Sequence, residues 1–308
     1  MKFALGMPAL ILYPPIMSPW EPEATPADIL RIARTADDLG FDWLTISEHI
    51  VLPDEMTEVM GRRFPESLSA AAFLAGATKR IRLLPYVLVL PYRNPVVLAK
   101  QIATLDFMSG GRFTLGAGAG HLEREFAVLN VPFNERGART DEYLQVMKEL
   151  WTSPAPAFQG RYVQFDKIAF EPKPVQKPHP PIFIGGNSRP AMRRAANFGD
   201  GWAPWLITRA QLPACLSYIH EQPGLRDHPR AFEVVMPLAT FQIEDYSHRV
   251  TGETLQPQQR EAVIEEIGLL AQAGATAVVV NPPRTQSVQH CVDWLAWFAQ
   301  EIMPVCRQ

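Results

Sequence analysis

Glu48 and His49 close the segment FDWLTISEHI, residues 41–50, which otherwise has the apolar composition of a buried strand. An imidazole titrates near neutral pH, so a histidine at a strand end can give or take a proton. The plainer interpretation is a capped strand end with a hydrogen-bonded histidine. Three other predicted strand ends favour a chemical site instead.

One of these strands ends in LGAGAGHLEREF, where small residues run from Gly116 to Gly120 and His121 follows. Backbone without bulky side chains can approach a flat ligand closely. The spacing is not a dinucleotide fingerprint, because His121 stands where its third glycine belongs. Close packing of strand against helix explains the small residues about equally well.

A second strand ends in IFIGGNSRPAMRRAA. Gly185 and Gly186 allow backbone N–H groups to turn outward, Ser188 can cap the next helix, and Arg189 adds positive charge there. Such a helix start binds phosphate groups. An ordinary glycine turn before a capped helix is the alternative interpretation.

The third strand, LLPYVLVLPYRNP, is interrupted by Pro85 and Pro91, which predicts an irregular backbone around Tyr86. Together, the four strand ends indicate a pocket for a planar cofactor that carries a phosphate. A histidine would be available there for proton transfer, as in a flavin-type site.

The elements that must position these residues alternate along the chain. Apolar residues at helical spacing lie between Thr25 and Gly40. Threonine is a common N-cap residue, and glycine commonly ends a helix. Further helices are predicted at 65–78, 95–108, 140–151, 188–198, 211–220, 258–273 and 287–302. The strands between them are predicted near the N-terminus and at 42–49, 80–90, 112–120, 180–186, 200–205, 232–241 and 276–283.

Eight strand and helix pairs in 308 residues predict one (β/α)8 TIM barrel that spans residues 1–308 as a single domain. Residues 153–181, which contain seven prolines, predict a small hairpin inserted between strands four and five. A doubly wound sheet would need a glycine-rich loop after the first strand. The chain has GMPALILYPP there instead.

The composition excludes several classes of function. The chain is 47% hydrophobic and 20% charged with a net charge of −3, so it lacks the basic surplus of a protein that binds nucleic acid or an anionic membrane. Three unpatterned cysteines argue against a disulfide framework, and prolines interrupt the apolar N-terminal run, so no signal peptide is expected. With no membrane-spanning run, we expect a cytoplasmic protein.

In five long motifs the chain resembles the luciferase-like monooxygenase superfamily, and most closely its deazaflavin (coenzyme F420)-dependent oxidoreductase branch. The motifs are SEH, LVLPYRNPVVLAKQIATLDFMSGGRFTLGAGAG, FNERGARTDEYLQVMKELWT, EPKPVQKPHPPIFIGGNS and RAANFGDGW. The resemblance implies a TIM barrel with an inserted segment, usually homodimeric, with its cofactor at the carboxyl ends of the strands.

The resemblance also implies roles for individual residues. His49 would supply the active-site acid or base, and His121 either assists it or only lines the pocket. His121 and Arg124 stand where sugar-phosphate dehydrogenases of this branch have Glu and Asn, so a sugar phosphate is not the expected substrate. A cis peptide without proline is expected at Tyr86-Val87. The residues expected to bind the cofactor are Glu48, Tyr86, Val87, Val89, Ala119, Gly120, Arg124, Gly185, Gly186, Ser188 and Arg189.

The resulting hypothesis is hydride transfer between coenzyme F420 and a small, apolar organic substrate. The alternative is an FMN-dependent monooxygenase that uses oxygen and a partner flavin reductase. A flavin-binding protein without catalysis is a third possibility. A metal-dependent barrel hydrolase is disfavoured, because the first strand has no His-x-His and no other cluster has metal-ligand spacing.

Overall fold

The computed structural model describes residues 1–225, 231–243, 248, 250–253 and 255–307. In these residues a parallel sheet has the order β3-β2-β1-β13-β10-β9-β8-β5-β4. Its strands are β1 (Lys2–Gly6), β2 (Trp43–Ile46), β3 (Arg82–Pro85), β4 (Leu88–Val89), β5 (Leu115–Gly118), β8 (Ile182–Gly185), β9 (Gly201–Ala203), β10 (Glu233–Pro237) and β13 (Ala277–Val280).

The two ends of this sheet are formed by one interrupted strand. The predicted third strand breaks into β3 and β4, with Tyr86 and Val87 between them. Leu83 in β3 accepts a hydrogen bond from Thr114 N (2.9 Å) and donates one to Arg112 O (2.9 Å), next to β5. These bonds close the sheet, so the predicted (β/α)8 barrel is confirmed.

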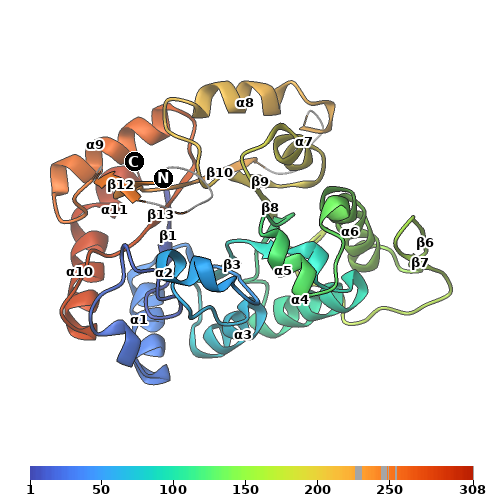
Figure 1. Ribbon diagram of the computed structural model, residues 1–308, viewed down its shortest axis with the longest axis horizontal. Helices are drawn as coiled ribbons and strands as arrows, with labels where there is room; N and C mark the ends of the chain where they lie inside the picture. Colours follow the sequence, from blue (N-terminus) through green and yellow to red (C-terminus); the bar gives the residue numbers. More distant parts are fainter. Residues whose placement is uncertain (226–230, 244–247, 249, 254, 308) are drawn as a thin grey trace.

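Helices surround the closed sheet in chain order, as Figure 1 shows. Those that follow the strands are α1 (Pro26–Leu39), α3 (Ser67–Ala77), α4 (Pro95–Ser109), α6 (Arg136–Thr152), α7 (Arg189–Phe198), α8 (Leu212–His220), α9 (Arg260–Gln272) and α10 (Val288–Glu301). The short helices α2 (Thr57–Met60), α5 (Glu123–Val128) and α11 (Met303–Cys306) lie in connections and at the C-terminal end.

The signals that predicted α1 have the expected geometry. The side chains of Thr25 and Asp28 form a reciprocal capping box, and Gly40 has a φ of +82° after the last turn. Glycine adopts this left-handed conformation without the steric cost that other residues pay. Local sequence therefore determines where this helix begins and ends.

Strand residues divide between two apolar clusters. One cluster lies between strands and helices and includes Phe3, Leu5 and the apolar faces of the helices. The other consists of strand residues that point into the barrel, among them Ala4, Trp43 and Phe183. The alternation follows from the two-residue period of a strand.

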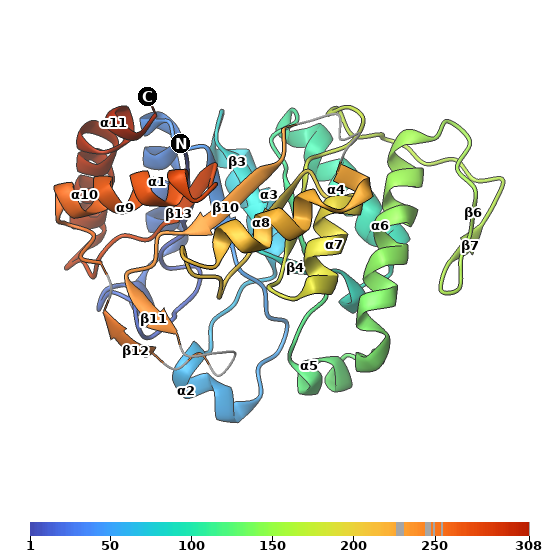
Figure 2. The ribbon, with the colours of Figure 1, turned by 90° about the horizontal axis from the view of Figure 1, so that it is seen from above.

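Two hairpins extend from the barrel. The first is β6 (Phe158–Gln159) with β7 (Gln164–Phe165), which confirms the predicted insertion and lies outside α6 in Figure 2. The second is β11 (Phe241–Ile243) with β12 (Val250–Glu253). The strand predicted at 232–241 forms as β10 over Glu233–Pro237, and Leu238 N still donates to Val279 O at 2.8 Å, whereas Phe241 belongs to β11.

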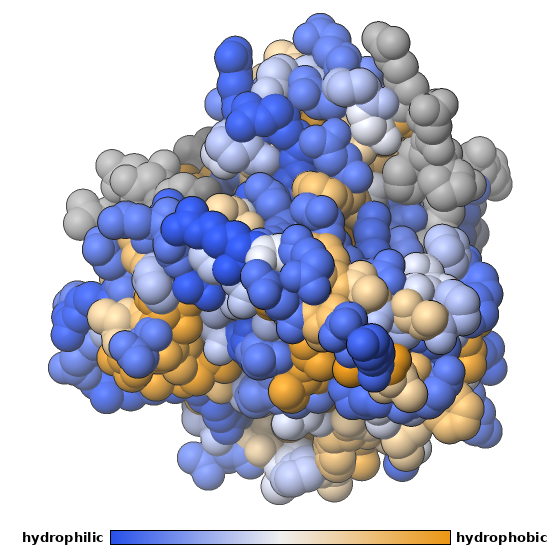
Figure 3. Space-filling model, turned by 90° about the vertical axis from the view of Figure 1, so that its right-hand side faces the viewer, coloured by the Kyte–Doolittle hydropathy of each residue, from blue (hydrophilic) through white to orange (hydrophobic). Residues whose placement is uncertain are grey.

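The surface seen in Figure 3 is mostly hydrophilic, with apolar side chains in small groups between polar ones. Among the described residues, no helix combines the length and the apolar character needed to cross a bilayer.

Candidate functional site

A cavity of about 1660 Å³ lies at the carboxyl ends of the barrel strands. This is the face at which TIM barrels assemble their active sites. Each strand or the loop after it contributes to the wall, through Met7, His49, Val89, Gly120, Gly186, Trp205, Met236 and Asn281 among others. The volume exceeds the usual range of about 300–1,000 Å³ for a ligand pocket, so a cofactor and a second molecule can fit together.

His49 lines this cavity and pairs with a carboxylate. Its Nδ1 lies 3.1 Å from Oε2 of Glu125, whose side chain is only 1% exposed. The other face of the imidazole is packed by Phe64, with ring centroids 4.9 Å apart. Sequence reasoning missed Glu125, although it lies four residues after His121 in the same segment, LGAGAGHLEREF.

His121 stands beside His49, with a ring-centroid distance of 6.1 Å. Burial, reinforced by the nearby His49, lowers the pKa of His121 from 6.5 to about 4. Its imidazole is therefore neutral near pH 7 and cannot act as a strong acid there. On its other side His121 approaches the ring of His248 at 5.9 Å, and His248 in turn stacks on Trp205 at 4.4 Å.

Glu48 lines the cavity next to His49 and also holds a neighbouring part of its wall. Its side chain is fully buried, and both carboxylate oxygens accept hydrogen bonds from Arg93, at 3.0 and 2.6 Å. One oxygen also accepts a bond from Val89 N at 2.8 Å. Although burial alone would lower the pKa of Arg93, its bonds to Glu48 and Glu66 raise it. The Glu48 carboxylate thus holds the backbone of Val89 at the cavity edge.

The Tyr86-Val87 peptide bond is cis, as the resemblance implied. The Tyr86 hydroxyl lies 3.3 Å from the carbonyl oxygens of both Pro204 and Val235, which share its single O–H donor. A Cβ on Gly118 or Gly185 would meet the methyl groups of Val87 at 2.6 or 2.8 Å. These glycines therefore make room for Val87, and all three residues line the cavity.

Val89, Ala119 and Gly120 form an adjoining part of the wall. Gly120 has a φ of +82°, and a Cβ there would lie 2.7 Å from both Val89 and Phe126. A residue with a side chain would be strained at this position and would also collide with its neighbours. The structure thus brings this predicted segment to the cavity.

The predicted phosphate loop also lies at the cavity. Gly185, Gly186 and Ser188 line it, and Ser188 caps α7 by accepting a hydrogen bond from Ala191 N. Arg189 does not contribute to the wall, because its guanidinium lies over the ring of Tyr218 on α8, 5.3 Å from the centroid. The prediction for Arg189 thus does not match its position in the structure.

A second helix start reaches the same end of the cavity. Asn134, Arg136 and Gly137 line it at the beginning of α6. Arg136 has five N–H donors, and one of its guanidinium nitrogens donates a hydrogen bond to Phe133 O at 3.1 Å. Sequence reasoning missed these residues because it began the helix at Thr140, one turn too late. FNERG contains Asn134, a residue type that often caps helices, but Glu135 occupies the N-cap position and its side chain makes no cap hydrogen bond.

Arg124 lies away from the cavity. Its side chain is 67% exposed and forms an ion pair with Glu55. Consecutive residues of a helix point in different directions, so Glu125 faces inward while Arg124 faces solvent. The prediction that Arg124 binds the cofactor is therefore not matched by its position in the structure.

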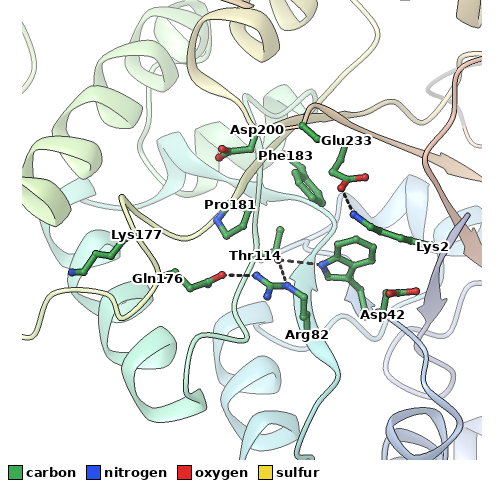
Figure 4. Close-up of a pocket in the computed structure, with 12 residues that line it drawn as sticks. Lys2, Asp42, Arg82, Thr114, Gln176, Lys177, Pro181, Phe183, Asp200 and Glu233 are labelled. Carbon is green, nitrogen blue, oxygen red and sulfur yellow. Dashed lines mark hydrogen bonds and ion pairs between the residues drawn. The ribbon is translucent and has the colours of Figure 1, made fainter. Parts of the chain in front are cut away.

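A separate cavity of about 510 Å³ lies at the opposite, amino-terminal ends of the strands (Figure 4). Its polar side chains bond to one another. Lys2 pairs with Glu233, Arg82 donates to Gln176 at 2.6 Å, and Thr114 accepts from Arg82 and Trp43 at 3.2 and 3.1 Å. This mutual pairing is typical of the stabilising face of a TIM barrel.

The structure is a closed barrel with a large cavity at the carboxyl ends of its strands, lined by His49 and by the starts of two helices. These features are typical of a barrel enzyme with its active site at that face. The model of the luciferase-like monooxygenase family matches residues 8–253. The chain belongs to this family.

Similar proteins differ in the cofactor that their names specify. An FMNH2-dependent dimethylsulfone monooxygenase of Pseudomonas putida is 29% identical over 64% of this chain and 55% of its own length. An F420-dependent glucose-6-phosphate dehydrogenase of Amycolatopsis mediterranei is 32% identical over 58% of this chain and 53% of its own. The chain spans 53–64% of the curated relatives that it matches.

The fold has counterparts among solved structures. The EDTA monooxygenase of Chelativorans sp. superposes with a TM-score of 0.78 over 100% of this chain and 93% of its own. Its sequence identity is 16%, so this similarity concerns the fold alone.

Proposed function

We propose that this protein is an F420-dependent oxidoreductase that transfers a hydride between the deazaflavin and a small, apolar organic substrate. The observation that carries the proposal is one cavity lined by His49 and by two helix starts, with Glu125 paired to His49 behind the wall. The F420-dependent relative of Amycolatopsis mediterranei supports the choice of cofactor.

The residues present suit a cofactor with a planar ring and a phosphate. Val87 and Val89 would contact the ring, because they give the cavity an apolar wall. The starts of α6 and α7, with Arg136 and Ser188, would hold the phosphate, since helix N-termini and guanidinium groups favour anions. When bound, the deazaflavin supplies a ring carbon that accepts or gives a hydride.

His49 would exchange the proton that accompanies hydride transfer. Its Nδ1 is held by Glu125, so the opposite ring nitrogen, Nε2, would serve the substrate. Glu48 would keep Val89 in place through its backbone bond. His121, which is neutral near pH 7, would form part of the substrate wall.

The substrate would occupy the part of the cavity framed by the loops after β1, β2, β9 and β10. Apolar and aromatic side chains dominate there, including Ile11, Ile16, Phe64, Trp205, Leu206 and Leu238. Such a wall favours an apolar molecule, because burying apolar surface drives its binding.

We also propose that the protein works as a homodimer. Large apolar side chains are exposed on neighbouring helices, Phe73 on α3 and Val97, Phe107 and Met108 on α4. A second copy could cover them. Light scattering on the purified protein would measure the mass, and a monomer at micromolar concentration would reject this part of the proposal.

A second candidate is an FMN-dependent monooxygenase that receives reduced flavin from a partner reductase. The Pseudomonas putida relative named for FMNH2 favours it. FMN also combines a planar ring with a phosphate, so the same residues would hold it. Substrate and cofactor binding would then exclude water from the pocket during reaction with oxygen.

The two cofactors are distinguished by titrating the purified protein separately with F420 and with FMN and following cofactor fluorescence. We expect F420 to bind more tightly. A preference for FMN would favour the monooxygenase and call for oxygen-uptake assays with a flavin reductase. Failure to bind either cofactor would reject both candidates.

Replacing His49 with Ala should lower turnover about 10²–10⁴-fold, the usual contribution of a positioned acid or base. The probe reaction is oxidation of reduced F420 by the quinone menadione, which takes up a hydride and a proton to give the hydroquinone. F420 affinity should be retained. His220→Ala, at the exposed end of α8, is the matched control, and equal rates for both variants would remove His49 from the mechanism.

A further inference from the structure

Glu125 is a buried carboxylate on a short helix, and its position is fixed by its neighbours. The next residue, Phe126, is fully buried between the rings of Tyr92 and Phe133, with centroids 4.8 and 5.2 Å away. Packing on both sides of Phe126 holds α5 in place. The carboxylate therefore has a defined location beside the cavity.

Each oxygen of this carboxylate has two partners. Oε1 accepts hydrogen bonds from the backbone N–H groups of Ile50 and Val51, at 2.5 and 3.2 Å. Oε2 accepts a bond from the Tyr92 hydroxyl at 2.8 Å and faces His49 Nδ1 at 3.1 Å. Glu125 thus holds both the imidazole of His49 and the two residues that follow it.

The charge of Glu125 determines the direction of its bond to His49. Burial would raise the pKa of Glu125, but the bonds from His49, Tyr92 and the backbone outweigh it and lower the pKa. An ionised carboxylate only accepts hydrogen bonds. The His49 Nδ1 must therefore carry a proton, which in the neutral ring leaves Nε2 unprotonated.

We propose that Glu125 is the positioning residue for His49: it fixes the ring orientation and the Nδ1–H tautomer, so that Nε2 is the atom that exchanges a proton in the cavity. This inference rests on the proposed function for the role of His49. The pairing itself is independent of the cofactor and can be tested without it.

The informative substitution is Glu125→Gln, because the backbone determines how the new amide must lie. The N–H groups of Ile50 and Val51 can only donate, so the amide oxygen must occupy the position of Oε1. The amide NH₂ then faces His49 Nδ1 and donates to it. His49 should switch to the Nε2–H tautomer with almost no change in side-chain volume.

The tautomer can be measured by long-range ¹H–¹⁵N NMR of protein labelled at histidine, at a pH where the ring is neutral. A His49→Gln sample assigns the signal. We expect Nδ1–H in the wild-type protein and Nε2–H in Glu125→Gln. An Nε2–H signal in the wild type would overturn the proposal even if the variant failed to fold, and so would an unchanged tautomer in a folded variant.

Turnover provides the second measurement, with reduced F420 and menadione as the probe. Glu125→Gln should lower kcat about 10²-fold or more, as expected when a catalytic imidazole has the wrong tautomer, while F420 affinity is retained. Glu123→Gln is the matched control, since Glu123 lies on the same helix but is exposed. A switched tautomer with unchanged kcat would overturn the proposal. Failure of the proposed function would appear separately, as absence of cofactor binding.

Discussion

At the scale of single residues, His49 and His121, two of the histidines that line the cavity, differ in environment. Glu125 accepts a hydrogen bond from His49, whereas His121 is surrounded by other rings and has a pKa of about 4. The same side chain therefore has a different hydrogen-bonding environment at each of the two positions. One is paired with a carboxylate, as the proposed proton exchange requires, and the other is neutral near pH 7.

The depressed pKa of His121 predicts a dependence of stability on pH. The folded pKa lies below the ordinary value of 6.5, so the unfolded state takes up the proton first as the pH falls. The free energy of unfolding should therefore decrease from pH 6.5 toward 4. Between pH 7 and pH 5 this loss should be about 1–2 kcal/mol, given about 1.4 kcal/mol per pKa unit.

This loss can be isolated by comparing the wild-type protein with His121→Phe, which keeps a flat ring but cannot titrate. Urea denaturation at pH 7 and pH 5 should show a smaller decrease in unfolding free energy for the variant, because the contributions of other groups cancel in the difference. Equal decreases would show that His121 is not desolvated in the folded protein.

At the scale of elements, the cavity floor depends on how β5 and β8 pack against the irregular segment between β3 and β4. Gly118 in β5 and Gly185 in β8 both lie against the methyl groups of Val87. The spacing of small residues in LGAGAG therefore has a packing reason. The sequence could show that side chains were missing there, but not which neighbour filled the space.

This packing predicts a coupling between Gly118 and Val87. Gly118→Ala should destabilise the protein by about 1–3 kcal/mol, because the new Cβ overpacks against Val87. In the double variant Gly118→Ala/Val87→Ala the added methyl gains room, so the combined loss should be smaller than the sum of the single losses. Urea denaturation of the three variants measures the coupling.

Gly76→Ala is the matched control. Gly76 lies in α3, and a Cβ there meets nothing within 4 Å. Alanine is favoured over glycine inside a helix, so this variant should be as stable as the wild type or slightly more so. Additive losses for Gly118 and Val87 would contradict the packing argument.

At the scale of the whole molecule, the two ends of the barrel have different tasks. The carboxyl end holds the large cavity, whereas at the amino end Arg82, Thr114 and Trp43 bond to one another. The proposed ligand site and the polar network at the amino end are thereby separated along the strands.

Thr114→Val tests this separation, because valine has nearly the same shape but no hydroxyl. Thr114 is fully buried, and its loss leaves the Trp43 and Arg82 donors without this acceptor. The cost should be about 1–3 kcal/mol of unfolding free energy, with F420 affinity unchanged. A parallel fall in affinity would show that the two ends of the barrel are coupled.

The amino-acid sequence by itself determined the barrel and most element positions. Helix period, the Thr25 cap, the Gly40 stop and the two prolines of the third strand are local signals, because they depend on backbone conformation within a few residues. They also indicated that His49 and the glycine segments lie at one face, since all parallel strand ends of a barrel meet there.

Only the tertiary structure decided which side chains touch across that face. Glu125 is 76 residues from His49 in the chain, and a difference of one position separates it from the exposed Arg124. Similarly, Arg136 lies at the cavity because α6 begins one turn earlier than the sequence predicted. Such contacts depend on the rotation and register of whole elements, which packing fixes and which local residue types do not encode.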